Sequence, residues 1–290
     1  MNRIAIVTDS NSGILPEKAS AFEGLFVVPM PVIIGSDTFY EGIDISQQRF
    51  YEVLSTRTDL RTSQPTLGNV TELWDGLLDD YDEIVHMPMS SGLSGSCSSA
   101  RMMAEDYGGR VHVVNNQRIS VTQKRSVYDA VKLRDAGRSA AEIAEHLERV
   151  KYESSIYIML DTLYYLKRGG RITPAAAAIG TALKIKPVLT IQGEKLDAFS
   201  VARTVSVARG KMIDAIRKDM NERMGGDSPD NMHLDIAYTY NSAIAEDYKQ
   251  QVMEAFPGYD DINVDPLSLS VSCHIGPGSL ALACSRKIRL

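Results

Sequence analysis

The sequence lacks the features that mark secreted, membrane-spanning and nucleic-acid-binding proteins. Its three cysteines are an odd number and widely spaced, which favours neither a disulfide framework nor a CxxC zinc site. No run approaches the roughly 18 apolar residues of a spanning helix, and the first residues, MNRIAIVTDS, lack the pattern of a signal peptide. A net charge of -6 disfavours wholesale binding of nucleic acid, because such binding relies on Lys and Arg side chains that neutralise the phosphates. These absences predict a cytoplasmic protein without bound metal or nucleic acid.

The first half of the chain alternates short apolar runs with helical patterns. Val70, Leu73, Trp74, Leu77 and Leu78 recur at the spacing of an amphipathic helix. Strands bounded by turn residues are predicted at 3–8, 26–28, 83–87 and 111–114, and another helix is predicted around 143–150. Strands alternating with helices indicate a parallel sheet covered on both faces.

A second pattern begins near residue 153. Strands are predicted at 155–160, 187–191 and 196–201, and Gln192-Gly193-Glu194-Lys195 is typical of a tight hairpin turn between the last two. Further strands at 234–238 and 262–266 flank a helix over 244–256, and another helix starts near 205. A hairpin among βα units indicates a mixed sheet. We therefore predict an α/β protein with two domains, residues 1–152 and 153–290.

Three small polar loops stand out as candidate binding segments: Thr62–Thr66, Ser90–Ser96 and His274–Gly278. The second follows a predicted strand and opens the next helix, where unpaired amides favour an anion. Ser94 with the amides of Gly95 and Ser96 is a candidate carboxylate or phosphate site. Helix capping and turn formation explain the same serines equally directly.

Enzyme motifs are incomplete in these loops. Gly92–Ser96 resembles a nucleophile elbow but ends in Ser where the motif needs Gly. Gly276–Ala281 matches a loose dinucleotide-binding pattern, but only nine residues follow it, too few for the βαβ unit. His274 lies in a glycine-rich loop where side chains are often exposed to ligands. A Cys273–His274 nucleophile is disfavoured because sequence neighbours rarely point the same way. The patterns place His86, His112 and His233 in strands and His146 on a helix, where packing or surface roles are expected.

A basic corner is predicted at Leu166–Pro174. One helix should end on Gly169, and Thr173 should cap the next helix, with Pro174 in its first turn. This arrangement displays Arg168 and Arg171. They either complement the helix dipole or, with Arg203 at a strand-to-helix junction, form a docking patch.

Taken together, these segments resemble the DegV family over nearly the whole chain. Thr8-Asp9-Ser10 matches the opening motif, and the later motifs follow in the family's order: Thr62–Pro65, Ser90–Ser96, Leu166–Ile172, Ile185–Pro187 and His274–Gly278. The resemblance implies two α/β domains with a long-chain fatty acid, such as palmitate, stearate or oleate, buried between them. It further implies a non-catalytic subunit of a fatty acid kinase, whose separate ATP-binding subunit phosphorylates the carboxylate for phospholipid synthesis.

The resemblance also implies residue roles. Thr62, Ser94 and Gly95 should bind the carboxylate, and His274 should complete the head-group network. Arg168, Arg171 and Arg203 match positions associated with the kinase partner, although the segment after Arg203 carries fewer basic residues than its relatives. Ala175–Ala178 and Ile179 are candidates for the tunnel wall or for ordinary helix packing. No cofactor is expected, and transient contact with a membrane surface fits such a carrier. A stand-alone acyl-ester hydrolase using Ser94 and a lipid sensor without a kinase partner are the alternatives.

Overall fold

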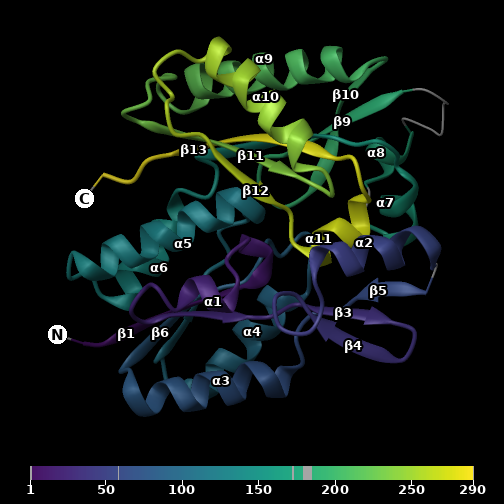
Figure 1. Ribbon diagram of the computed structural model, residues 1–290. Coiled ribbons are helices and arrows are strands. Elements are labelled where there is room, and N and C mark those ends of the chain that lie inside the picture. Colours follow the sequence, from purple (N-terminus) through teal and green to yellow (C-terminus); the bar gives the residue numbers. More distant parts are fainter. Residues whose placement is uncertain (1, 58, 172, 179–184, 290) are drawn as a thin grey trace. The chain divides into compact units, whose positions relative to one another are not determined.

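The computed structural model describes residues 2–57, 59–171, 173–178 and 185–289. The chain forms two compact units, labelled by element in Figure 1. The first contains residues up to Ser46 and Asp59–Lys151, whereas α2 (Gln47–Thr56) belongs with Tyr152–Arg289 in the second. The predicted division at residue 152 stays a prediction, and the structure adds that one helix from the first half of the chain packs within the second unit.

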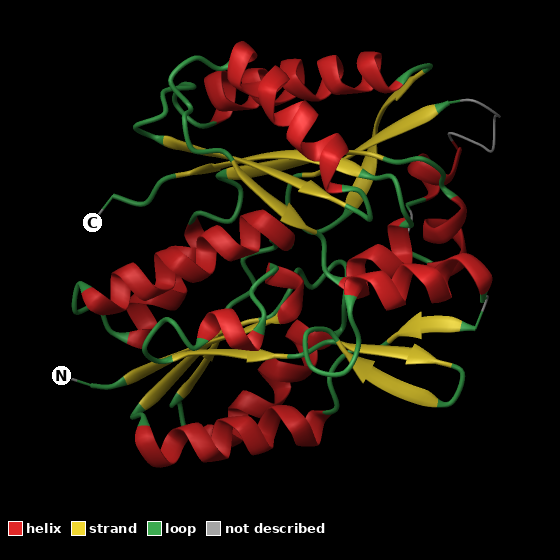
Figure 2. Cartoon of the chain, viewed as in Figure 1, coloured by secondary structure: helices red, strands yellow, loops and turns green. Residues whose placement is uncertain are grey.

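A four-stranded sheet forms the centre of the first unit, in the order β2-β1-β6-β7, and all its pairs run parallel (Figure 2). Helices α3 and α4 cover one face, and α5 and α6 contact the other. This confirms the predicted parallel sheet. The strands are β1 (Ile4–Asp9), β2 (Leu25–Val28), β6 (Glu83–Met87) and β7 (Val111–Val113). The helices are α3 (Leu67–Asp80), α4 (Ser96–Ala104), α5 (Ser120–Asp135) and α6 (Ala140–Arg149).

The apolar face of α3 explains how this helix is held on the sheet. Val70, Trp74 and Leu77 are buried against Val7 and Ile84 of the strands, as the sequence spacing predicts. The Trp74 ring packs edge-on against His86, with 5.4 Å between the ring centroids. Burial of such a large ring makes α3 a fixed wall of the first unit.

A small antiparallel sheet in the first unit, in the order β4-β3-β5, is absent from the prediction. Its strands are β3 (Pro31–Ile34), β4 (Asp37–Tyr40) and β5 (Leu60–Thr62). Thr62 pairs with Val32 at the end of β5. The sheet thereby fixes the backbone of a predicted binding residue. The remaining short helices of this unit are η1 (Ser10–Ser12), α1 (Pro16–Ala19) and η2 (Glu105–Tyr107).

The second unit is built on a six-stranded sheet in the order β10-β9-β8-β13-β11-β12, in which β11 and β12 pair in parallel and the other neighbours antiparallel. This confirms the mixed sheet and the hairpin. Gly193, with φ of +106°, lies in the turn that joins β9 to β10. The strands are β8 (Ser154–Met159), β9 (Lys186–Ile191), β10 (Leu196–Ala202), β11 (Met232–Tyr238), β12 (Asn263–Pro266) and β13 (Leu280–Arg286).

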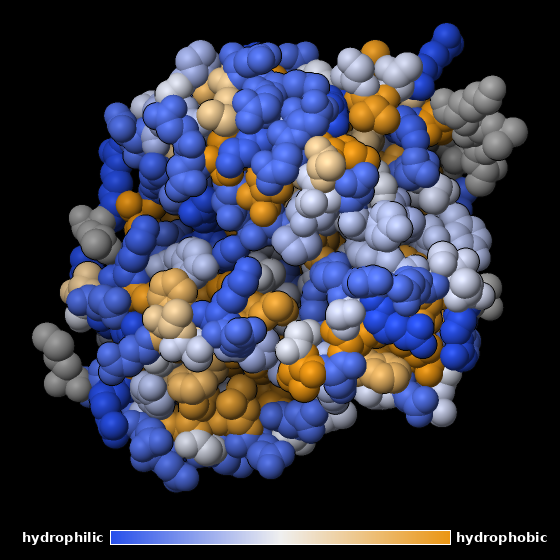
Figure 3. Space-filling view, in the orientation of Figure 1, coloured by the Kyte–Doolittle hydropathy of each residue, from blue (hydrophilic) through white to orange (hydrophobic). Residues whose placement is uncertain are grey.

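Helices α9 (Val205–Arg223) and α10 (Ser242–Ala255) pack on this sheet through buried residues such as Met212 and Tyr248. Figure 3 shows that the outer surface over these two helices is mostly hydrophilic, as expected of amphipathic helices on a sheet. Within the described ranges, no helix combines the length and apolar character that crossing a bilayer requires.

The basic corner differs in two details from its prediction. It is formed by α7 (Tyr164–Gly169), α8 (Pro174–Ala178) and α11 (Leu269–Ile275). Gly170 rather than Gly169 adopts the left-handed conformation after α7, with φ of +68°. The expected loop position of His274 is wrong, because this residue lies in the last turn of α11. Thr173 caps α8 as predicted, and its Oγ1 accepts a hydrogen bond from the amide of Ala176 at 3.2 Å.

Candidate functional site

Two of the predicted polar loops meet within the first unit. Gln64, in the loop after β5, donates a hydrogen bond from Nε2 to Ser99 Oγ of α4 at 3.2 Å. A Cβ atom built on Gly95 would stand 2.9 Å from Gln64 Oε1, so Gly95 permits a close approach of the two loops. The structure therefore brings the segment that follows Thr62 against the segment that contains Ser94 and Gly95.

Ser94 stands at the start of α4 and is half-buried. Its hydroxyl lies 2.7 Å from Ser96 Oγ and accepts a hydrogen bond from the Ser96 amide at 3.2 Å. Gly95, rather than Ser94, is the N-cap of α4, so this bond between residues two apart supports the turn-forming interpretation of Ser94. An esterase would need an imidazole at the serine hydroxyl, whereas the side chain that hydrogen-bonds to the Ser94 hydroxyl is that of Ser96, another hydroxyl.

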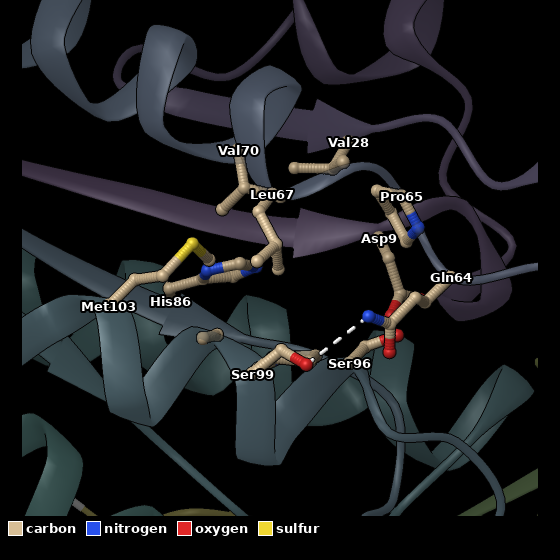
Figure 4. A pocket seen from close by; sticks show the side chains of 12 residues that line it. Asp9, Val28, Gln64, Pro65, Leu67, Val70, His86, Ser96, Ser99 and Met103 are labelled. Atoms are coloured by element: carbon tan, nitrogen blue, oxygen red, sulfur yellow. Dashed lines mark hydrogen bonds between the residues drawn. The ribbon is translucent and has the colours of Figure 1, made fainter.

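A small cavity of about 20 Å³ lies in the first unit between the parallel sheet and helices α3 and α4 (Figure 4). Gln64 and Ser96, from the two meeting loops, line one end of it. The remaining lining is largely apolar and includes Leu67 and Met103. The full lining is Asp9, Val28, Gln64, Pro65, Leu67, Val70, His86, Pro88, Ser96, Ser99, Ala100 and Met103. The cavity therefore has polar loops at one end and apolar walls beyond them.

Asp9 lines this cavity and is the last residue of β1. Its carboxylate accepts hydrogen bonds from the amide of Met89 at 2.7 Å and the amide of Asn11 at 3.0 Å. Gln123 Nε2 donates to it at 3.3 Å. Complete burial raises the pKa of Asp9 to about 6, against these hydrogen bonds, which act to lower it. Asp9 thus holds the turn after β6 in place at the carboxyl edge of the sheet, where ligands of α/β proteins bind.

His274 belongs to the second unit, where it lies with Arg168 and Arg171. Burial, followed by the charges of Arg171 and Arg168, lowers the pKa of His274 to about 4. The imidazole is therefore neutral at pH 7. Arg171 donates from Nη1 to the carbonyl of Gly169 at 2.6 Å. The sequence did not predict this grouping of His274 with the two arginines, and its meeting with Thr62 and Ser94 stays a prediction.

Arg168 is held between aromatic rings at this corner. Its guanidinium lies 5.7 Å from the centroid of Tyr164 and 5.4 Å from that of Tyr165. Its Nη2 atom is buried without a hydrogen-bond partner in the described part of the chain. Burial raises the pKa of the neighbouring Cys273 thiol to about 11, which disfavours a thiolate nucleophile there. Arg203 is exposed between β10 and α9, and its side chain forms no hydrogen bond or ion pair with the described residues of this corner.

The chain matches the family model described as an uncharacterised protein of the DegV family over residues 3–287. It belongs to the DegV family. A DegV domain-containing protein of Deinococcus radiodurans is 30% identical over 284 residues, with 97% of each chain covered. A fatty-acid-binding DegV family protein from Thermus thermophilus superimposes with a TM-score of 0.88 at 27% identity, covering 98% of this chain and 99% of that one. DegV from Bacillus subtilis, described as a fatty acid binding protein, gives 0.84 at 25% identity, covering 99% and 100%.

The sequence interpretation missed four polar residues of the cavity: Asp9, Gln64, His86 and Ser99. Asp9 and Gln64 lie inside motifs that the sequence did single out, so the family motifs were the available signal for them. His86 was expected to be a packing residue, and it is buried as expected but also lines the cavity. Of the suggested tunnel wall, Ala175 is exposed and Ala176 is buried, whereas Ile179 and the side chains of 177–178 lie outside the described residues.

Proposed function

We propose that this DegV family member binds a long-chain fatty acid with the carboxylate at the two meeting loops and the tail in the cavity of the first unit. The observation that carries this proposal is the cavity itself, which has polar loops at one end and apolar walls beyond. The fatty-acid binding described for the Thermus and Bacillus relatives supports the same assignment.

The head-group site would combine hydroxyl and amide donors. Thr62 and Ser94 each offer a hydroxyl, and the amide of Gly95 lies beside them at the N-terminus of α4, where a helix favours an anion. Hydrogen bonds to a carboxylate are stronger than bonds between neutral groups, which favours the ionised acid at this end. His274 would complete the network as a neutral donor.

The tail would supply most of the affinity. Burying about 15 methylene groups at roughly 0.8 kcal/mol each gives on the order of 12 kcal/mol, an upper bound that chain ordering reduces. A cavity of about 20 Å³ is close to the space of one water molecule. The chain must therefore enter as flexible lining side chains turn aside, and Leu67, Met103 and Gln64 have the rotamer freedom to do so.

The chemistry of the second unit supports a non-catalytic role in a two-part fatty acid kinase. Arg168 has a buried N–H group to which no described residue hydrogen-bonds, and Arg171 is exposed beside it. Guanidinium groups bind phosphoryl oxygens in a bidentate manner, so this corner suits an acyl phosphate or the surface of an ATP-binding partner. Arg203 would extend the docking surface from the end of β10.

Mass spectrometry of the gently purified protein tests lipid binding, and we expect one long-chain fatty acid per chain. Protein that stays empty when stearate is offered would contradict the proposal. Adding an ATP-binding fatty acid kinase subunit and ATP should then give acyl phosphate. Binding without phosphorylation would favour the alternative of a lipid sensor that has no kinase partner. Release of acid from an acyl ester, if Ser94→Ala abolished it, would establish an esterase.

A further inference from the structure

His86 is a polar residue placed in an apolar row of the first unit. It lies on β6, and its partners in register on the neighbouring strands are Val7 of β1 and Val113 of β7. Residues paired in register point to the same face of a sheet, so His86 faces α3 and α4 together with these valines. Ile84, two residues earlier on β6, is part of the apolar core of that face.

The imidazole of His86 is buried without a complete set of partners. The residue is 3% exposed, and no described residue hydrogen-bonds to its Nδ1 atom. The Trp74 ring that packs edge-on against it also has a buried Nε1 that bonds to none of the residues the structure describes. Buried polar atoms normally have a hydrogen-bond partner, so two such atoms on adjacent rings indicate a polar group that the described residues do not supply.

His86 lines the same cavity as the head-group loops, but not at the same end. Figure 4 shows its ring next to Met103 and Leu67, while Gln64, Ser96 and Asp9 gather at the other side of the cavity. A ligand whose carboxylate lies at the loops would therefore pass His86 with its alkyl chain. An unsubstituted chain would leave the imidazole nitrogen without a partner.

We propose, on the basis of the proposed fatty-acid binding, that the channel selects a fatty acid carrying a hydroxyl group on its chain, which hydrogen-bonds to His86. A hydroxyl both donates and accepts, so it fits either tautomer of the neutral ring. A site built to bond a substrate hydroxyl discriminates against the analogue that lacks it, because the polar group of the site is then left unpaired. Burial lowers the pKa of His86 to about 3, which keeps the ring neutral at pH 7.

The test compares delipidated protein binding stearate with its binding a series of hydroxystearates that carry the hydroxyl at successive chain positions. Displacement of a fluorescent fatty acid gives the dissociation constants. We expect one or two neighbouring positions to bind roughly five- to tenfold more tightly than stearate, the value of one neutral hydrogen bond. In His86→Leu, the preference for a hydroxystearate should disappear. Stearate should bind to His86→Leu more tightly than it binds to the protein that retains His86.

His112→Leu is the matched control, because His112 lies on the adjacent strand β7 and does not line the cavity. It should retain the preference. Thermal unfolding verifies that both variants fold, and His86→Gln, which keeps a donor and an acceptor, should retain part of the preference. Equal affinity for stearate and every hydroxystearate, or a preference that persists in His86→Leu, would overturn the assignment. Failure to bind any of these acids would instead count against the proposed function.

Discussion

The imidazole of His274 lies directly over Gly169. A methyl group built on Gly169 would overlap His274 Nδ1 and stand 3.1 Å from Cε1. The relationship is reciprocal, because a methyl group on Gly276, after α11, would overlap the ring of Tyr165 on α7. The two helices therefore approach each other through two glycines. This close packing fixes the His274 ring beside Arg168 and Arg171.

We predict that Gly169→Ala destabilises the protein by about 1–3 kcal/mol, the usual cost of inserting a methyl group into a filled space. Urea unfolding measures the change in free energy. The ring of His274 must also move, so its NMR signals should shift in the folded variant.

Gly210→Ala provides the matched control. Gly210 is also helical, on α9, and a Cβ atom there would meet no atom of the described residues within 4 Å. Since Ala is the better helix former, this change should stabilise the protein by about 0.5–1 kcal/mol. Similar effects of the two substitutions would show that His274 does not occupy the space over Gly169.

The head-group assignment predicts that Thr62→Val and Ser94→Ala weaken fatty-acid binding while the protein stays folded. Each change removes a hydrogen bond to a charged group, worth about 1.5–3 kcal/mol, or roughly tenfold to over a hundredfold in the dissociation constant. Isothermal titration of delipidated protein with oleate measures this loss. Ser94→Ala should also reduce stability by about 0.5–1.5 kcal/mol, because it removes the hydrogen bond from the Ser96 amide to the Ser94 hydroxyl.

Ser98→Ala controls for the serine-rich composition of the segment. Ser98 lies on the exposed side of α4 and lines no part of the cavity. Its substitution should leave the affinity for oleate unchanged. Unaltered affinity for oleate in both Thr62→Val and Ser94→Ala would show that the carboxylate does not bind at these loops.

The elements that the sequence predicted are those with a periodic apolar face. The strand predicted at 83–87 is β6 residue for residue, and the pattern around Trp74 is α3. By contrast, the sequence does not predict α5. Its buried side includes Ser120, Thr122 and Gln123, so hydropathy shows no helical period there. Strand β4 is exposed or half-buried along its length and offers no alternation either.

The candidate site likewise has one part that the sequence predicts and another that it does not. Thr62, Ser94 and His274 lie in motifs that can be read along the chain, whereas the cavity is assembled from strands and helices between Asp9 and Met103. No local pattern reports that such distant residues face one another. His86 illustrates the difficulty, because its position in a strand predicts burial but gives no sign of the cavity beside it.

The basic corner predicts a measurable titration for His274. Burial lowers its pKa to about 4, and the charges of Arg171 and then Arg168 contribute. Replacing Arg171 by Gln removes one of these charges, so the pKa should rise but stay below 6.5, because burial remains. The chemical shift of the His274 Cε1 proton against pH measures it. Lys195→Gln, in the hairpin turn, should not alter the titration curve. An unchanged curve in Arg171→Gln would show that the charge of Arg171 does not act on the His274 imidazole.

Burial of His86 predicts acid sensitivity of the fold. The pKa of His86 falls from 6.5 to about 3 on folding, so the folded state keeps the ring neutral while the unfolded chain takes up a proton below pH 6.5. This stabilisation is complete above 6.5 and is lost as the pH falls toward 3, at about 1.4 kcal/mol per pH unit. His86→Leu removes it, so between about pH 7 and about pH 4.5 the variant should lose roughly 2–3 kcal/mol less stability than the unsubstituted protein.

Asp9 acts in the opposite direction over part of this range. Its pKa is raised from 3.8 to about 6, so its contribution is complete below 3.8 and is lost as the pH rises through 6. Because Asp9 is present in both proteins, its effect cancels in the comparison. Urea unfolding at several pH values gives the two stability curves. Parallel curves would mean that the imidazole reaches water in the folded state, and the buried, unpartnered nitrogen that motivates a hydroxylated ligand would then be lost as well.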